Sequence, residues 1–216
     1  MPPAQDHKRL LNNNEGPNTG GMGAYCRCLL VSEAYLEYLK ENVLQRVIDG
    51  MKAQGSPYVG VLYAGLMMTK DGPKVLEYNC RFGDPETQVI LPLLESDLYS
   101  IMLACVYGKL SDQSIEWSKN KHAVGVVVVS GGYPESYQKG KVITGLEKIV
   151  GNTIVFHADT SKASGNLVTS GGRVLTVVTF EDTLKEASAV AYLNTGFVKF
   201  EGTFYRTDIA AKSLEK

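Results

Sequence analysis

The sequence lacks the features that mark membrane proteins, secreted proteins and nucleic-acid-binding proteins. Its longest apolar runs, such as residues 123–129, are far shorter than the roughly 18 residues that cross a bilayer. The first residues are polar and contain no apolar segment of the signal-peptide kind. The formal net charge is only -1, and lysine and arginine are scattered instead of forming a stripe. We therefore expect a cytoplasmic protein that binds neither nucleic acid nor membrane.

Cysteine and histidine are also scarce, which argues against a metal site built from these residues. The four cysteines include no Cys-x-x-Cys pair and show no repeated spacing. Cys26 and Cys28 form a Cys-x-Cys pair, but no second pair matches it, and the three histidines lie far apart. We predict that all four cysteines are free thiols. The chain also contains no internal repeat and no low-complexity tract.

The apolar content is sufficient for a folded core. Of the 216 residues, 44% are hydrophobic, which suits one large domain or two small ones. Residues 108–121 are polar and loosely patterned, and we place a domain boundary there, between a first domain at 1–110 and a second at 120–216. The pattern changes across this boundary from mixed helix and strand to mainly strand. We therefore predict an α+β fold.

Local patterns predict the order of the helices and strands. Ser32 suits a helix N-cap, and apolar residues recur behind it at helical spacing. The turn Lys-Asp-Gly-Pro at 70–73 lies between two strand-like segments and predicts a β-hairpin. The first domain is predicted to contain a helix at 33–53, strands at 58–69 and 74–79, and helices at 86–94 and 97–107. The second is predicted to contain strands at 123–130, 142–145, 153–158, 166–170 and 173–180, a helix at 182–194 and a last strand at 197–204.

The most informative segment begins at the end of the predicted hairpin. Glu77 and Asn79 are two residues apart in a strand-like segment, so they present a carboxylate and an amide oxygen on one face. Both are hard oxygen ligands that suit Mg²⁺ beside phosphate oxygens and water. No acidic residue lies between Tyr58 and Met68 in the preceding strand, so we expect this chain to supply a small set of metal ligands.

An arginine and a tight turn follow this pair. Arg81 offers a planar fork that suits a phosphate or a carboxylate. Gly83, Asp84 and Pro85 then turn the chain, with Asp84 predicted as the N-cap of the next helix and Pro85 as its first residue. The same residues allow a plainer interpretation, in which Arg81 pairs with Asp84 or Glu86 and the turn only caps a helix.

A second segment, near the N-terminus, is rich in glycine. Residues 15–25 read Glu-Gly-Pro-Asn-Thr-Gly-Gly-Met-Gly-Ala-Tyr, and their closely spaced glycines let the backbone approach a ligand and turn N–H groups toward an anion. Lys8 and Arg9 place positive charge nearby. By composition alone, the segment would equally suit a flexible glycine-rich tail.

Together these segments resemble the glycinamide ribonucleotide synthetases, also called phosphoribosylamine–glycine ligases. The run Arg-Phe-Gly-Asp-Pro-Glu-x-Gln at 81–88 matches a signature of this family, and Asp-His-Lys-Arg at 6–9, with residues 15–25, resembles its substrate loop. One departure is Arg27, which stands where the family usually has proline. The resemblance covers nearly the whole chain, but only the C-terminal half of the family's protein.

The resemblance implies a fold and a reaction. The family belongs to the ATP-grasp ligases, so we expect the second lobe of an ATP-grasp fold followed by a small α+β C-terminal domain. The implied reaction uses ATP, with Mg²⁺ or Mn²⁺, to join glycine to 5-phosphoribosylamine through a glycyl phosphate in de novo purine synthesis. Some family members are fused to further purine-pathway domains, so such domains are possible partners.

The resemblance also implies roles for residues of this chain. Glu77 and Asn79 would hold the metal, and Arg81 would steady the transferred phosphoryl group or the acyl phosphate. Asp84 would orient the substrate amine or only cap its helix, and Arg173 of the second domain is assigned to packing. Substrate or intermediate would be cradled by Lys8, Asn18, Thr19, Gly20, Gly21, Met22 and Gly23.

The sequence contains only part of what the family's reaction requires. The first ATP-grasp lobe, which carries nucleotide contacts, has no counterpart here, so we expect ligase activity to need that half. Two alternatives stay open. One is a folded, non-catalytic module for binding or assembly, and the other is a different ATP-grasp carboxylate–amine ligase, although such enzymes generally lack the run at 81–86.

Overall fold

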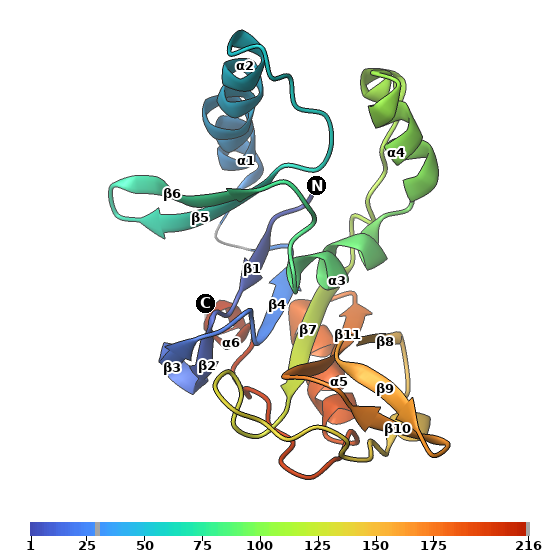
Figure 1. Cartoon of the computed structure of the whole chain (residues 1–216). Coiled ribbons are helices and arrows are strands. Elements are labelled where there is room, and N and C mark those ends of the chain that lie inside the picture. The colour runs from blue at the N-terminus through green and yellow to red at the C-terminus, as the bar shows by residue number, and fades with distance from the viewer. Residues whose placement is uncertain (29–30, 215–216) are drawn as a thin grey trace. The chain divides into compact units, whose positions relative to one another are not determined.

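The computed structural model describes residues 1–28 and 31–214, and the chain forms two compact units (Figure 1). Unit 1 contains residues 1–28, 84–93 and 118–216, and unit 2 contains residues 29–83 and 94–117. The units therefore cross the predicted boundary, because the first 28 residues pack with the C-terminal part of the chain. The prediction of sequence domains at 1–110 and 120–216 stays a prediction.

Unit 1 is built on a five-stranded antiparallel sheet with the order β1-β4-β7-β11-β8 (Figure 1). Its strands are β1 (Ala4–Asp6), β4 (Gly23–Cys26), β7 (His122–Val129), β11 (Arg173–Glu181) and β8 (Thr153–His157). The strand predicted at 123–130 is confirmed as β7. The sheet joins both ends of the sequence, since β4, which directly follows the glycine-rich residues, pairs with β7 at a distance of about 100 positions along the chain.

Strand β7 is apolar along its length because both of its faces are covered. Val124 and Val126 belong to a cluster with Leu184 and Ala187 of α5 (Leu184–Thr195). On the other face, an added Cβ at Gly125 would lie 2.9 Å from Cγ1 of Val89 in α3 (Glu86–Ile90). This two-sided burial explains a run of valines in place of the alternation that a half-exposed strand shows.

Helix α5 begins where the sequence predicts a helix. The Thr183 hydroxyl accepts the Glu186 N–H at 3.1 Å and donates to the Glu186 carboxylate at 2.8 Å, which is a capping arrangement. Two short hairpins and a terminal helix complete unit 1. They are β2 (Arg9–Leu11) with β3 (Glu15–Asn18), β9 (Thr160–Ala163) with β10 (Asn166–Thr169), and α6 (Ala211–Leu214).

Two predicted strands of unit 1 are wrong. Residues 142–145 and 197–204 form only isolated bridges, among them Thr144 with Lys199. The chain turns at both places, because Gly145 and Gly202 have φ angles of +90° and +78°. Thr203 closes the second turn by accepting the Phe200 N–H on its hydroxyl at 2.7 Å. These positive φ angles end the extended conformation that the apolar pattern indicates.

Unit 2 contains the predicted helix and hairpin. Ser32 caps α1 by accepting the Tyr35 N–H at 3.3 Å, and Asp97 caps α4 by accepting the Ser100 N–H at 2.8 Å. Lys70 and Asp71 form the turn of the hairpin. The elements are α1 (Glu33–Leu39), a π-helical stretch η2 (Lys40–Gln45), α2 (Arg46–Ala53), β5 (Tyr63–Thr69), β6 (Gly72–Asn79) and α4 (Leu98–Val106). Within the described residues, none of the helices has the length and apolar character of a membrane span.

Candidate functional site

The glycine-rich loop joins β3 to β4 and is hydrogen-bonded to the segment that follows β1. Thr19 donates both its N–H and its hydroxyl to the Lys8 carbonyl, each at 2.8 Å. Met22 donates its N–H to the His7 carbonyl, and His7 donates its own N–H to the Gly23 carbonyl, each at 2.9 Å. The loop is therefore a fixed turn, and not the flexible tail that its composition also allowed.

The glycines of this loop are required by close contacts with other parts of unit 1. Gly21 has a φ of +120°, and a Cβ there would lie 2.4 Å from Cδ of Pro85 and 2.9 Å from Oδ1 of Asp6. A Cβ at Gly20 would lie 2.9 Å from Cζ of Arg173. The close backbone approach expected from the sequence is thus present, and the groups approached belong to the protein. The glycine-rich loop and the Gly-Asp-Pro-Glu turn meet at Gly21 and Pro85.

The N–H groups of this loop are largely engaged by protein acceptors. In addition to those of Thr19 and Met22, the Gly20 N–H donates to the Tyr133 hydroxyl and the Gly21 N–H donates to the Thr19 hydroxyl, both at 3.0 Å. The Met22 side chain is fully buried and anchors the loop in the core. A ligand at this loop would therefore meet exposed side chains, such as those of Lys8 and Asn18, more readily than free backbone donors.

Asp84 does not cap the next helix, which corrects the sequence prediction. Helix α3 begins at Glu86, the N-cap position is Pro85, and no side chain caps it. The Asp84 carboxylate instead accepts two hydrogen bonds from Arg173, at 3.0 Å on Oδ1 and 2.7 Å on Oδ2. Gln88 donates a further bond to Oδ1 at 3.1 Å. The long-range partner wins because a bidentate, charge-assisted pair is stronger than a single capping bond.

Arg173 is the first residue of β11 and reaches both sequence motifs. Besides holding Asp84, it donates to the Gly20 carbonyl at 3.0 Å. Two glycines before it leave room for this arrangement. A Cβ at Gly172 would lie 2.4 Å from the Tyr133 ring, and one at Gly171 would lie 2.2 Å from the Asp159 carboxylate.

Two buried ionisable residues, Asp6 and His7, lie in the segment that is hydrogen-bonded to the loop. The Asp6 side chain is 8% exposed and forms a short ion pair with Lys8. Burial raises the pKa of Asp6 to about 6, against the lowering effect of Lys8, and the nearby Glu86 carboxylate adds to the rise. Burial and the positive charge of Arg206 lower the pKa of His7 to about 4. Because Lys8 forms the ion pair with Asp6, its positive charge is partly neutralised, and it offers a ligand less positive charge than the sequence indicates.

Arg206 fixes the β2–β3 hairpin from which the loop extends. Its side chain is 1% exposed and binds both oxygens of Asp208 at 2.7 Å. The same guanidinium donates to the Arg9 carbonyl at 2.9 Å and to Oδ1 of Asn14 at 3.3 Å. A buried arginine that makes four hydrogen bonds in this way holds the hairpin to the C-terminal segment.

The predicted metal pair lies on β6 of unit 2. Glu77 and Asn79 lie on the same face, as predicted, because the Asn79 amide donates to Oε1 of Glu77 at 3.1 Å. One carboxylate and one amide oxygen are a donor set that fits a divalent cation. The described residues contain no cluster of three or more His, Cys, Asp or Glu side chains arranged to hold a metal.

Arg81 lies between the two groups of residues in sequence and belongs to unit 2. Its Nη1 donates to the Phe82 carbonyl at 2.9 Å. The plainer interpretation, in which Arg81 pairs with Asp84 or Glu86, stays a prediction; within unit 1, the Asp84 carboxylate is bound by Arg173. Loop residues, Asp84 and Arg173 thus come together within unit 1, whereas Glu77, Asn79 and Arg81 belong to unit 2.

Sequence reasoning missed Tyr133, assigned Arg173 to packing and gave Asp6 no role of its own within Asp-His-Lys-Arg. The available signals were the two glycines directly before Arg173 and the acidic residue of Asp-His-Lys-Arg. All four cysteines are free, as predicted.

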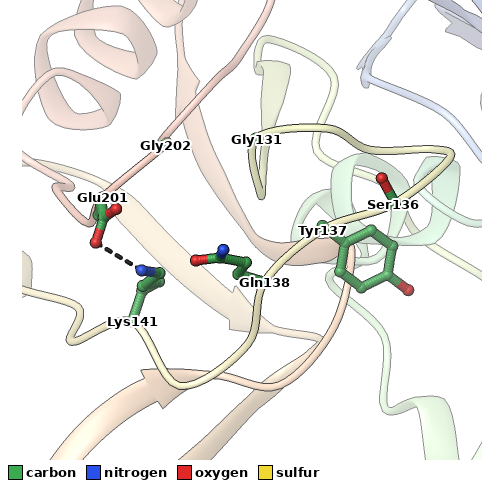
Figure 2. A pocket seen from close by; sticks show the side chains of 7 residues that line it. All are labelled: Gly131, Ser136, Tyr137, Gln138, Lys141, Glu201 and Gly202. Carbon is green, nitrogen blue, oxygen red and sulfur yellow. Dashed lines mark hydrogen bonds and ion pairs between the residues drawn. The ribbon is translucent and has the colours of Figure 1, made fainter.

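Unit 1 also contains an open polar cavity of about 470 Å³ (Figure 2). Its only ion pair joins Lys141 to Glu201 at 2.6 Å. None of the predicted site residues lines it. The lining residues are Gly131, Ser136, Tyr137, Gln138, Lys141, Glu201 and Gly202.

Comparison with known families gives two matches, one in each half of the chain. Residues 1–87 match the phosphoribosylglycinamide synthetase ATP-grasp (A) domain, and residues 123–212 match the phosphoribosylglycinamide synthetase C domain. The trifunctional purine biosynthetic protein adenosine-3 of Gallus gallus is 54% identical over 215 residues, which are 99% of this chain and 21% of that protein. A bifunctional purine biosynthetic protein of Pichia angusta is 48% identical over the whole chain and 28% of its own length.

Solved structures agree in fold. The phosphoribosylamine–glycine ligase of Thermotoga maritima superposes with a TM-score of 0.86 at 37% identity, over 97% of this chain and 51% of that protein. The biotin carboxylase of Campylobacter jejuni superposes with a TM-score of 0.60 at 15% identity, a likeness of fold alone. The chain therefore spans about half the length of the solved ligase, and 21% and 28% of the lengths of the two multifunctional relatives.

Proposed function

The chain belongs to the phosphoribosylglycinamide synthetase family, and we propose that it forms the second ATP-grasp lobe and the C-terminal domain of a phosphoribosylamine–glycine ligase. The observation that carries the proposal is the contact between the family's two motifs. Gly21 of the glycine-rich loop packs directly on Pro85 of the Gly-Asp-Pro-Glu turn, with room for no side chain between them.

The proposed reaction has two steps. The glycine carboxylate attacks the terminal phosphate of ATP to give glycyl phosphate and ADP. The amine of 5-phosphoribosylamine then attacks the acyl carbon, which releases phosphate and gives glycinamide ribonucleotide. The first step brings like charges together, so the protein must place positive charge and hydrogen-bond donors around the reacting groups.

We assign the charged tasks to both units. Glu77 and Asn79 would hold Mg²⁺ or Mn²⁺, which when bound neutralises phosphate charge. Arg81 would bind the transferred phosphoryl group through its planar fork. Lys8, Asn18 and Thr19 would border the substrate at the glycine-rich loop. The loop backbone is fixed by hydrogen bonds made at Gly20, Gly21, Met22 and Gly23.

Asp84 is the proposed acceptor for the substrate amine. A carboxylate offers about four acceptor positions. Arg173 and Gln88 donate three hydrogen bonds to it, and its side chain is 50% exposed. One position is therefore left for a donor from the substrate, while the capping role that the sequence also allowed is absent.

The wider context is also proposed. The relatives named above are bifunctional and trifunctional purine biosynthetic proteins, which favours fusion or association of this chain with other purine-pathway domains in the cytoplasm. A folded module without catalysis of its own is the second candidate, because the chain spans about half of the solved ligase.

The test measures phosphate release with ATP, Mg²⁺, glycine and freshly generated 5-phosphoribosylamine. Two samples are compared. One is the 216-residue chain, and the other, the joined protein, is this chain fused to the part of the Thermotoga maritima ligase that the chain does not cover. Each is made with Glu77→Ala and with Glu41→Ala, a control at an exposed acidic residue of the same unit.

We expect the joined protein to release phosphate only when both glycine and the amine are present, and Glu77→Ala to abolish this release while Glu41→Ala preserves it. Activity of the 216-residue chain itself would show that the half-site suffices. Silence from both well-folded samples would overturn the ligase proposal and leave the non-catalytic module.

A further inference from the structure

Arg173 connects the second half of the chain to both motifs of the first half. Its guanidinium makes three hydrogen bonds to two different segments, the Asp84 carboxylate and the Gly20 carbonyl. These partners lie 89 and 153 positions away in the sequence. The Arg173 side chain is 23% exposed, so its bonds are partly sheltered from water.

Both backbone polar groups of Gly20 are hydrogen-bonded to residues from the C-terminal half of the sequence. Arg173 donates to its carbonyl, and the Tyr133 hydroxyl accepts its N–H. Gly172 allows both contacts, because a Cβ there would collide with the Tyr133 ring. Packing alone would not require hydrogen bonds to both the N–H and the carbonyl of Gly20.

We propose that Arg173 is a positioning residue, which fixes Asp84 and the glycine-rich loop relative to each other so that both meet the same substrate. This inference rests on the proposed function. The planar fork of arginine satisfies Asp84 bidentately and still donates to Gly20, whereas the single ammonium group of lysine lacks this fixed geometry. Arg173 thus acts through Asp84 and Gly20 and touches no reacting atom itself.

The first experiment measures backbone amide hydrogen exchange in the 216-residue chain, and it needs no catalytic activity. With Arg173→Gln, we expect the Gly20 and Gly21 amides to exchange about 10-fold faster, while those of β7 keep their rates. Lys121→Gln is the matched control, because it removes another ion pair of unit 1, the 2.7 Å contact with Asp182. Unchanged exchange at Gly20 and Gly21 in a folded variant would overturn the inference.

The second experiment measures kinetics in the joined protein described above. We expect Arg173→Gln to lower kcat by about 10- to 100-fold, because small misplacements of substrate-positioning groups have effects of this size. The KM for ATP should change less than about twofold, and Arg173→Lys should recover only part of kcat. A merely structural role would predict full recovery by lysine, or equal losses for Arg173→Gln and Lys121→Gln.

The two experiments separate the inference from the function on which it rests. If the unaltered joined protein is inactive, the ligase proposal fails, and the exchange data alone decide whether Arg173 fixes the loop. If Arg173→Gln does not fold, Asp84→Asn removes the charge of the partner and must give the same rise in exchange at Gly20. Absence of that rise would overturn the inference.

Discussion

Gly21→Ala tests the contact between the two motifs. Gly21 has a φ of +120°, a region that only glycine enters readily, and imposing alanine there costs about 1–2 kcal/mol of backbone strain. The new Cβ would also lie 2.4 Å from Cδ of Pro85, and relief of such overpacking typically costs about 1–3 kcal/mol. We therefore expect Gly21→Ala to lower the free energy of unfolding of unit 1 by about 2–5 kcal/mol.

The control is Gly140→Ala in the same unit. Gly140 has a φ of +80°, but an added Cβ there would have no neighbour within 4 Å, so only the backbone strain of about 1–2 kcal/mol applies. The assay is a urea titration in which the amide exchange of β7 reports on unit 1. The single tryptophan, Trp117, belongs to unit 2 and would report on the wrong unit. If the two variants prove equally stable, the motifs do not meet as described.

Three further predictions concern the support of the loop. Burial raises the pKa of Asp6 from 3.8 to about 6, so the folded state binds a proton on the Asp6 carboxyl more tightly than the unfolded state does. This proton binding stabilises the folded state fully below pH 3.8, and the stabilisation is lost as pH rises through 6. In urea titrations, Asp6→Asn should therefore gain about 2–3 kcal/mol relative to the unaltered chain between pH 4 and pH 7, and a constant difference would contradict the buried acid. Arg206→Met leaves the Asp208 carboxylate without its buried partner and should lower the free energy of unfolding by about 3–5 kcal/mol in the same titration. An effect under about 1 kcal/mol would refute the role of Arg206 in fixing the β2–β3 hairpin. Thr183→Ala removes the cap of α5 and should cost about 1 kcal/mol, with Thr183→Ser retaining most of the stability; equal losses in both would argue against the cap.

Local features of the fold were predictable because short segments determine them. The cap at Ser32 and the hairpin turn at 70–71 each depend on residues within four positions of one another. The same-face placement of Glu77 and Asn79 follows from the period of a strand. These predictions are confirmed, and the hydrogen bonds at Ser32 and at Glu77 both join residues that are near in sequence.

The predictions that failed concern groups with distant partners or special backbone angles. Asp84 has the sequence context of an N-cap, but Arg173 takes its carboxylate from 89 positions away, and no local rule detects that partner. The segment at 197–204 has an apolar pattern typical of a strand, but the positive φ of Gly202 bends it. The glycine-rich residues suggested free backbone donors, whereas Tyr133 and His7 supply acceptors that only the folded sheet brings close.

These contacts bear on how the two halves of the sequence share one function. Strand β4, which directly follows the glycine-rich loop, pairs with β1 on one side and with β7 on the other. One of the two edges of β4 is thus paired with residues beyond position 120. A strand that loses such a neighbour exposes unpaired backbone N–H and C=O groups. Arg173 adds the hydrogen bond to Gly20. The residues that match the C domain therefore have more than a packing role, since the conformation of the proposed substrate loop depends on them.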